Sequence, residues 1–141
     1  MKRIYFATIS TLLLNQFNSI AQVNHSKLKH DSVGLNVDAY YAKVYKKEKN
    51  VLVYFSADWC VPCIKLKPTI KQIEEEEKER VEVLNLDVDE NPKIATYFEI
   101  NTLPLFILYK NGKKVWERNM FTSKADLLKA INLYAIKTNV K

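Results

Sequence analysis

The chain has 141 residues, of which 48% are hydrophobic and 27% are charged, so its composition is that of an ordinary globular protein. The formal net charge of +6 is spread along the chain, without a cluster of Lys and Arg interleaved with aromatic side chains. This pattern argues against nucleic acid as a partner. Only two cysteines are present, three positions apart.

The first 21 residues predict a signal peptide. Met1-Lys2-Arg3 is a basic head, residues 4–14 are mostly apolar, and Ser19-Ile20-Ala21 has the small-x-small pattern of a cleavage site. The apolar run is too short for a permanent membrane span, which needs about 20 residues. A buried first helix is the alternative interpretation. We therefore expect an exported, periplasmic protein that is cleaved after Ala21.

Cleavage there would leave 120 residues with a formal net charge of +4, because it removes Lys2 and Arg3 and no acidic residue. This length suffices for one domain with a hydrophobic core, but not for two. Residues 22–36 contain few apolar side chains and are expected to form a flexible leader. The single domain is then predicted over residues 37–141.

The first half of this domain alternates between helix and strand patterns. Tyrosines and valines at helical spacing predict a helix over residues 37–45. The continuous apolar run at residues 51–56 is typical of a strand that is buried on both faces. Pro62 then lies in the first turn of a second helix, where its missing N–H has no cost. The apolar face of this helix is predicted to contain Ile64, Leu66, Ile70 and Ile73.

The second half continues with a strand at residues 81–86, a short helix at residues 92–98 and a strand at residues 105–109. Asn111-Gly112 predicts a type I′ hairpin, which leads to an antiparallel partner strand. Ser123-Lys124-Ala125-Asp126 resembles a capping box and begins a final helix. The order of elements predicts an α/β fold with a central mixed β-sheet and helices on both faces.

Cys60 and Cys63 lie at the junction between the buried strand and the second helix. Residues i and i+3 share a helix face, so the two sulfurs can reach disulfide distance. Cys60 lies at the helix N-terminus, where unpaired N–H groups stabilise a thiolate, whereas Cys63 lies one turn deeper. Since an accessible thiolate attacks and a buried thiol resolves, Cys60 is the predicted nucleophile and Cys63 the resolving cysteine.

Other interpretations of the pair are open at this point. A structural disulfide is possible, but closing so small a loop constrains the unfolded chain little. A zinc site would have to recruit His25 and His30 from the leader. A cysteine hydrolase would need a histidine in the folded domain, and none follows His30. An inert pair of thiols is the last alternative.

Trp59-Cys60-Val61-Pro62-Cys63, five residues before Pro68, resembles the active site of the thioredoxin family. The similarity continues through Asp87-Val88-Asp89-Glu90-Asn91-Pro92, Thr102-Leu103-Pro104 and Tyr109-Lys110-Asn111-Gly112, over roughly residues 37–136. It implies a thioredoxin-like fold and a monomeric thiol–disulfide oxidoreductase. The implied partners are protein thiols or disulfides and an electron donor or acceptor. No metal and no cofactor beyond the Cys60–Cys63 disulfide is expected.

The resemblance also implies the roles of several residues. A cis bond is expected between Leu103 and Pro104, across the substrate groove from the dithiol. The backbone at Leu103 would pair with the substrate chain like an added strand. Trp59 would act as a lid-like aromatic residue, and Val61 and Pro62 would belong to the surface offered to partners. The alternative for Pro104 is an ordinary trans proline at the start of a strand.

Tyr54 departs from the family's pattern, because thioredoxins usually carry a buried Asp at this position. The Lys that accompanies this Asp is replaced by Asn85. A neutral phenol is a poor proton acceptor near pH 7. Tyr54 is therefore predicted to tune the dithiol, and Cys63 would lose its proton to water or to the departing Cys60 thiolate.

Two further departures concern the groove. Val61 replaces the usual Gly between the cysteines, and Met120 replaces the Gly after the hairpin, which predicts a bulkier groove wall. Residues 55–60 are also similar to the dithiol domains of envelope reductases, which favours a reductant for envelope proteins. The alternative function is a thioredoxin-fold binding module or assembly subunit with an incidental dithiol.

Overall fold

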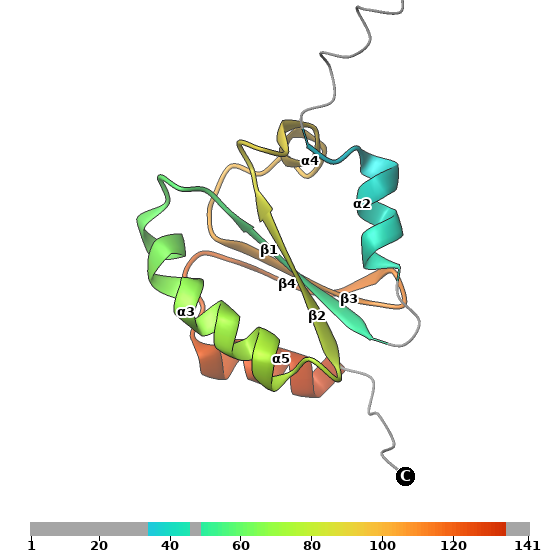
Figure 1. The fold of residues 1–141 in the computed structure, drawn as a ribbon, viewed down its shortest axis with the longest axis vertical. Coiled ribbons are helices and arrows are strands. Elements are labelled where there is room, and N and C mark those ends of the chain that lie inside the picture. Colours follow the sequence, from blue (N-terminus) through green and yellow to red (C-terminus); the bar gives the residue numbers. More distant parts are fainter. Residues whose placement is uncertain (1–33, 46–48, 135–141) are drawn as a thin grey trace, which may run out of the picture. The chain divides into compact units, whose positions relative to one another are not determined.

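The computed structural model describes residues 34–45 and 49–134 (Figure 1). The chain divides into two units, Met1–Ser32 and Val33–Lys141, and all of the described residues belong to the second unit. The predicted signal peptide and residues 22–33 of the predicted leader lie outside the described residues.

The order of helices and strands agrees with the prediction. The elements are α2 (Val37–Val44), β1 (Asn50–Ser56), α3 (Val61–Glu76), β2 (Val81–Asp87), α4 (Pro92–Tyr97), β3 (Leu105–Lys110), β4 (Lys113–Asn119) and α5 (Lys124–Tyr134).

The four described strands form one mixed sheet in the order β2-β1-β3-β4. Strand β1 is parallel to β2 and antiparallel to β3, and β3 pairs with β4 through a hairpin. The hairpin residues Asn111 and Gly112 have φ values of 52° and 73°, as the predicted type I′ turn requires. Strand β4 is the outer strand on one side, and its exposed side chains include Lys113, Lys114, Glu117 and Arg118.

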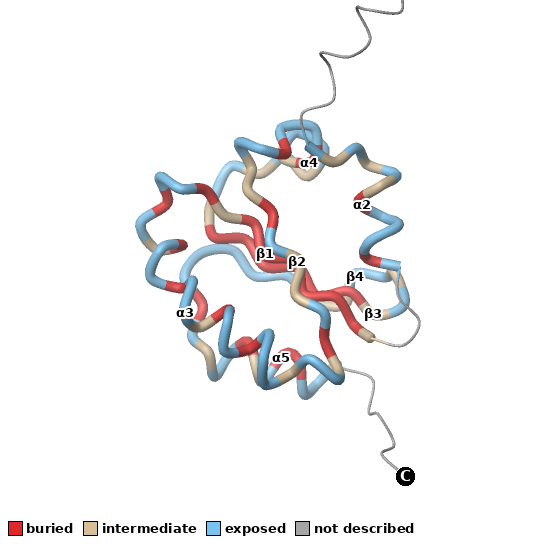
Figure 2. Tube along the Cα trace, in the orientation of Figure 1, coloured by how far each residue is buried: buried red, intermediate tan, exposed pale blue. Residues whose placement is uncertain are grey.

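Helices cover both faces of the sheet, as predicted. Figure 1 shows α3 and α5 on one face and α2 and α4 on the other. Successive side chains of a strand point to opposite faces, so Tyr54 packs in the cluster with α3 and α5, whereas Phe55 packs in the cluster with α2 and α4. Figure 2 shows that the central strands β1 and β3 are buried along most of their length. This burial matches the continuous apolar runs of their sequences.

The apolar face of α3 differs from the predicted face at one position. Ile64 was expected to face the core, but its side chain is 48% exposed. The buried residues are Cys63, Leu66, Ile70 and Ile73, which follow the helical spacing i, i+3, i+7 and i+10. Ile64 lies about 100° around the helix from Cys63 and therefore points away from the sheet.

The end of the predicted leader contacts the folded domain. The backbone N–H of Leu35 donates a hydrogen bond to Asn91 Oδ1 at 2.9 Å. Asn36 is the N-cap of α2, because its side chain accepts a hydrogen bond from the N–H of Ala39 at 2.8 Å. Leu35 and Asn36, at the end of the predicted leader, are thus part of the folded domain.

Candidate active site

The two cysteines lie where β1 leads into α3, and the structure joins them in a disulfide with a Cα–Cα distance of 5.2 Å. Cys60 is the N-cap of α3, and its Sγ accepts a hydrogen bond from the N–H of Cys63 at 3.2 Å. Pro62 lies in the first turn of the helix, as predicted. The sulfur of Cys60 therefore faces the unpaired N–H groups that favour a thiolate.

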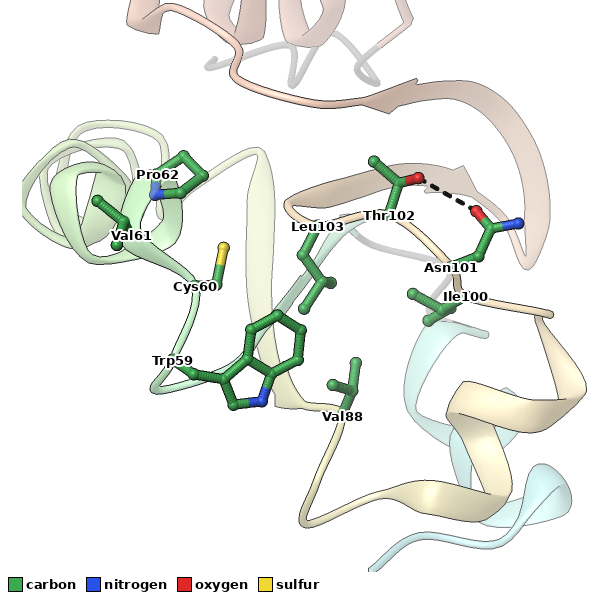
Figure 3. A pocket seen from close by; sticks show the side chains of 9 residues that line it. All are labelled: Trp59, Cys60, Val61, Pro62, Val88, Ile100, Asn101, Thr102 and Leu103. Atoms are coloured by element: carbon green, nitrogen blue, oxygen red, sulfur yellow. Dashed lines mark hydrogen bonds between the residues drawn. The ribbon is translucent and has the colours of Figure 1, made fainter.

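A groove of about 400 Å³ lies beside Cys60 (Figure 3). Both cysteines are buried in the disulfide form, with Cys60 4% and Cys63 0% exposed. Only Cys60 borders the groove, so the two sulfurs differ in access from solvent. The groove is lined by Trp59, Cys60, Val61, Pro62, Val88, Ile100, Asn101, Thr102 and Leu103.

Five of these lining residues were predicted from the sequence, and four were not. Val88 and Thr102 lie within sequence motifs that were recognised, but neither was selected as a site residue. Ile100 and Asn101 lie in the loop between α4 and β3, which reaches the groove only through the fold of the domain. Nothing in their residue types indicates this position.

The peptide bond between Leu103 and Pro104 is cis, as the family resemblance implied. Leu103 is partly buried and lines the groove, whereas Pro104 is buried and is not among the lining residues. The carbonyl oxygen of Pro104 accepts a hydrogen bond from the N–H of Met120 at 2.9 Å. Met120 thus lies next to the cis bond, and its side chain is 65% exposed.

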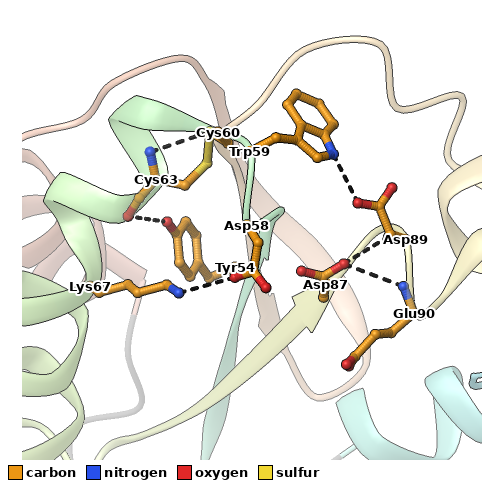
Figure 4. A network of polar contacts seen from close by, with 9 residues as sticks. All are labelled: Tyr54, Asp58, Trp59, Cys60, Cys63, Lys67, Asp87, Asp89 and Glu90. Atoms are coloured by element: carbon orange, nitrogen blue, oxygen red, sulfur yellow. Dashed lines mark hydrogen bonds and ion pairs between the residues drawn. A yellow bond between two sulfur atoms is a disulfide. The ribbon is translucent and has the colours of Figure 1, made fainter.

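Trp59 is held at the rim of the groove by the loop after β2. Its Nε1–H donates a hydrogen bond to Asp89 Oδ2 at 2.8 Å, although the side chain is 66% exposed (Figure 4). That loop is itself ordered by Asp87, whose Oδ1 accepts hydrogen bonds from the N–H groups of Asp89 and Glu90 at 2.8 and 3.3 Å. The indole therefore has a defined position beside Cys60.

Tyr54 lies beneath the disulfide, on the face of β1 that packs against α3. The side chain is 2% exposed, and its ring stacks on Phe106 with a centroid distance of 4.9 Å. Its hydroxyl donates a hydrogen bond to the carbonyl oxygen of Cys63 at 3.1 Å. Burial raises the pKa of Tyr54 to about 12, so the phenol is neutral near pH 7. Asn85 pairs with Tyr54 in the register of β1 and β2.

A second pocket, of about 370 Å³, lies beside Tyr54 on the α3 side of the sheet. Its charged lining residues are Lys67, Lys71 and Glu74. Lys67 Nζ also lies 3.3 Å from Asp58 Oδ1 in an exposed ion pair.

Within residues 34–45 and 49–134, no group of three or more His, Cys, Asp or Glu side chains is placed to hold a metal ion. The residues required by the zinc interpretation, His25 and His30, lie outside the described residues. Of the helices in this part of the chain, none is long and apolar enough to cross a membrane.

A disulfide at the start of a helix, with one sulfur beside a groove and a cis-proline next to it, defines a thiol–disulfide oxidoreductase. A family model described as Thioredoxin matches residues 31–133, and the chain belongs to the thioredoxin family. It is 35% identical to a thioredoxin of Rickettsia bellii over 94 residues, which cover 67% of this chain and 90% of that protein. The thioredoxin of Rickettsia felis is 37% identical over the same length and the same coverage.

Solved structures show the same fold. One comes from a study of thiol resolution in yeast mitochondrial 1-Cys peroxiredoxin by the glutathione and thioredoxin systems. It has a TM-score of 0.62 and 25% identity, and the match covers 69% of this chain and 89% of that chain. Another is thioredoxin-2 of the malaria parasite, described as a component of protein secretion machinery. It has a TM-score of 0.60 and 28% identity, with 63% of this chain and 86% of that chain covered.

Proposed function

We propose that this oxidoreductase reduces disulfides of exported proteins, with Cys60 as the nucleophile and Cys63 as the resolving cysteine. The observation that carries this assignment is the difference in access: Cys60 lines the groove, whereas Cys63 is fully buried behind it. A substrate sulfur in the groove can approach Cys60 Sγ directly. Cys63 can reach only Cys60.

The reaction proceeds by two exchange steps. The Cys60 thiolate attacks one sulfur of the substrate disulfide, that bond breaks, and the other substrate sulfur leaves as a thiolate. The Cys63 thiolate then attacks Cys60 Sγ, which releases the second substrate thiolate and forms the Cys60–Cys63 disulfide. The substrate gains two electrons and the dithiol loses two, and an external dithiol donor restores the reduced form. No bound cofactor takes part in either step.

The groove supplies the binding surface for the substrate chain. Trp59, Val61 and Pro62 form one wall, and Leu103 forms part of the opposite wall (Figure 3). We expect the backbone of Leu103 to pair with an extended substrate segment, as an added strand would. One copy of the chain contains every residue of this groove, so the proposal requires only a monomer.

Reduction of insulin disulfides tests the assignment. The wild type should precipitate insulin B chain in the presence of dithiothreitol, and Cys60→Ser should lose this activity. Cys63→Ser should instead accumulate a mixed disulfide between Cys60 and the substrate, which non-reducing electrophoresis and mass spectrometry detect. Equal turnover by the wild type and Cys60→Ser would contradict the proposal and favour a binding module with an incidental dithiol.

The export of the protein and the direction of its exchange reaction are tested by separate measurements. The sequence pattern at residues 1–21 supports export to the periplasm, where disulfides persist. N-terminal sequencing of the protein from cells should find Gln22 as the first residue. The reduction potential of the Cys60–Cys63 pair should lie well below that of an oxidase, and the pair should be reduced in cells. An oxidised pair with a high potential would contradict the reductase direction.

A further inference from the structure

The hydroxyl of Tyr54 is an anchor for the first turn of α3. It donates a hydrogen bond to the carbonyl oxygen of Cys63, and its ring is fixed by stacking on Phe106 of β3, with an angle of 14° between the two planes (Figure 4). The ring belongs to β1, stacks on β3 and also packs in the core cluster with α3, so the hydroxyl joins the sheet to the first turn of that helix. The backbone of Cys63 is therefore tied to the sheet at its carbonyl oxygen.

The N–H of the same residue points at the other cysteine. It donates a hydrogen bond to Cys60 Sγ at 3.2 Å. In the reduced protein we expect this N–H to donate to the Cys60 thiolate, and hydrogen bonds to charged acceptors are stronger than those to neutral ones. The N–H and the carbonyl oxygen belong to the same residue. A movement of the Cys63 backbone away from Tyr54 would therefore also change the distance from its N–H to Cys60 Sγ.

We propose that Tyr54 is a positioning residue of the dithiol, which holds the backbone of Cys63 so that its N–H stabilises the Cys60 thiolate. This inference rests on the proposed role of Cys60 as the nucleophile. Tyr54 itself neither takes nor gives a proton, because its phenol stays protonated throughout the physiological range. Its effect passes through the hydrogen bonds of Cys63.

Charged side chains from more than one element lie near Tyr54 and Trp59. The groove adds no titratable side chain among its described lining residues other than Cys60. Replacement of Tyr54 by Phe alters none of the charges and retains the stacked ring, so a difference between the two proteins reports the hydroxyl alone. The nearby charged residues are Asp58, Lys67, Lys71, Glu74 and Asp89.

The test measures the pKa of Cys60 in the reduced full chain. The rate of Cys60 alkylation by iodoacetamide is followed against pH, with the modified residue identified by mass spectrometry. Loss of the anchor removes part of the stabilisation of the thiolate, so Tyr54→Phe should raise the pKa of Cys60 by about 0.5. The reduction potential should become more negative, because the reduced form is the one that loses stability.

Tyr40→Phe is the matched control. Tyr40 is also a buried phenol, and its hydroxyl donates to the hydroxyl of Tyr109 at 2.9 Å on the opposite face of the sheet. The Tyr40→Phe variant should lose about as much stability as Tyr54→Phe, but the pKa of its Cys60 should equal that of the wild type. An unchanged pKa in Tyr54→Phe, or equal shifts in both variants, would overturn the inference.

A second measurement uses the wild type and so does not depend on the folding of a variant. When Cys60 titrates in the reduced protein, the Cζ resonance of Tyr54 should follow with the same midpoint, and that of Tyr40 should not. A Tyr54 resonance that stays constant would also overturn the inference. Neither readout involves a protein substrate, so failure of the proposed function in the insulin assay remains distinguishable from failure of this inference.

Discussion

The two cysteines and Tyr54 form one hydrogen-bonded unit at the end of β1. Cys63 is its central member, because its N–H and its carbonyl oxygen contact Cys60 and Tyr54 respectively. This arrangement differs from a buried acid, which would accept a proton from Cys63 directly. With a neutral phenol below it, we expect Cys63 to lose its proton to water or to the departing substrate thiolate when it attacks the mixed disulfide.

Replacement of Tyr54 by Asp should therefore change the pH dependence of resolution. Burial raises the pKa of a carboxyl group toward neutrality, and the ionised form can accept the Cys63 proton. We expect the rate of mixed-disulfide resolution in Tyr54→Asp to rise at least about tenfold across this transition, as measured by stopped-flow exchange with a labelled disulfide. Tyr54→Asn is the control, because the Asn side chain has nearly the shape of Asp and does not titrate. Identical pH–rate profiles for Tyr54→Asp and the wild type would contradict the prediction.

Met120 occupies a backbone conformation that favours glycine, with a φ of 72°. Its side chain is mostly exposed, so little packing is lost when it is removed. Met120→Gly should raise the free energy of unfolding by about 1 kcal/mol, measured by urea denaturation. Asn119→Gly, one residue earlier in β4, should lower it instead, because a strand conformation gains nothing from glycine. A loss of stability in Met120→Gly would contradict this account.

At the scale of elements, Asn91 connects the segment before α2 with the loop that holds Trp59. Its Oδ1 accepts the N–H of Leu35, and its Nδ2 donates to the carbonyl oxygen of Asp87 at 2.8 Å. Asp87 in turn orders the residues around Asp89, the partner of Trp59. Gly34 lies against the same loop, and a Cβ there would collide with the backbone carbonyl oxygen of Glu90.

Asn91→Ala should lower the free energy of unfolding by about 1 to 2 kcal/mol, because the partly buried N–H of Leu35 loses its acceptor, whereas the carbonyl oxygen of Asp87 keeps the backbone N–H of Asn91. Urea denaturation of the full chain measures this loss. Asn101→Ala removes an exposed amide at the same end of the sheet and should cost less than about 0.5 kcal/mol. Equal losses of unfolding free energy in Asn91→Ala and Asn101→Ala would contradict this prediction.

At the scale of the whole molecule, the features predicted correctly from sequence are those with a local cause. Apolar runs predict β1 and β3, and Asn111-Gly112 predicts the hairpin, because hydrophobic spacing and turn geometry act over a few residues. Ile64 was misplaced because spacing alone does not show which neighbouring stripe of a helix faces the sheet. Ile100 and Asn101 could not be predicted in the groove, since their position depends on how the loop after α4 packs.

Buried phenols should make the fold sensitive to alkali. Burial raises the pKa values of Tyr40, Tyr54 and Tyr109 in the folded state, whereas phenols of the unfolded chain ionise near pH 10. Above pH 10 the folded state therefore binds more protons than the unfolded state, so stability falls as the pH rises from about 10 toward 12. Urea titrations between pH 7 and 11 should show this fall, and Tyr40→Phe should make it less steep. A flat profile would contradict the argument.

The disulfide should contribute only a minor part of the stability of the domain. It closes a loop of a few residues, because the two cysteines are three positions apart, and the chain-entropy relation gives about 2 kcal/mol for such a loop. The Cys60→Ser/Cys63→Ser double variant should still unfold cooperatively, as measured by circular dichroism in urea. A variant that no longer folds would instead favour the structural-disulfide interpretation of the pair.

The charges of β4 have a consequence for aggregation. An unpaired strand edge can recruit the edge of another chain, and each addition exposes a new edge, which is how fibrous assemblies grow. Lys113, Lys114, Glu117 and Arg118 oppose this growth, since a neighbouring copy would have to desolvate them. Under the proposed function, an extended substrate segment would pair instead with the backbone of Leu103 in the groove beside the dithiol, and exchange would release it.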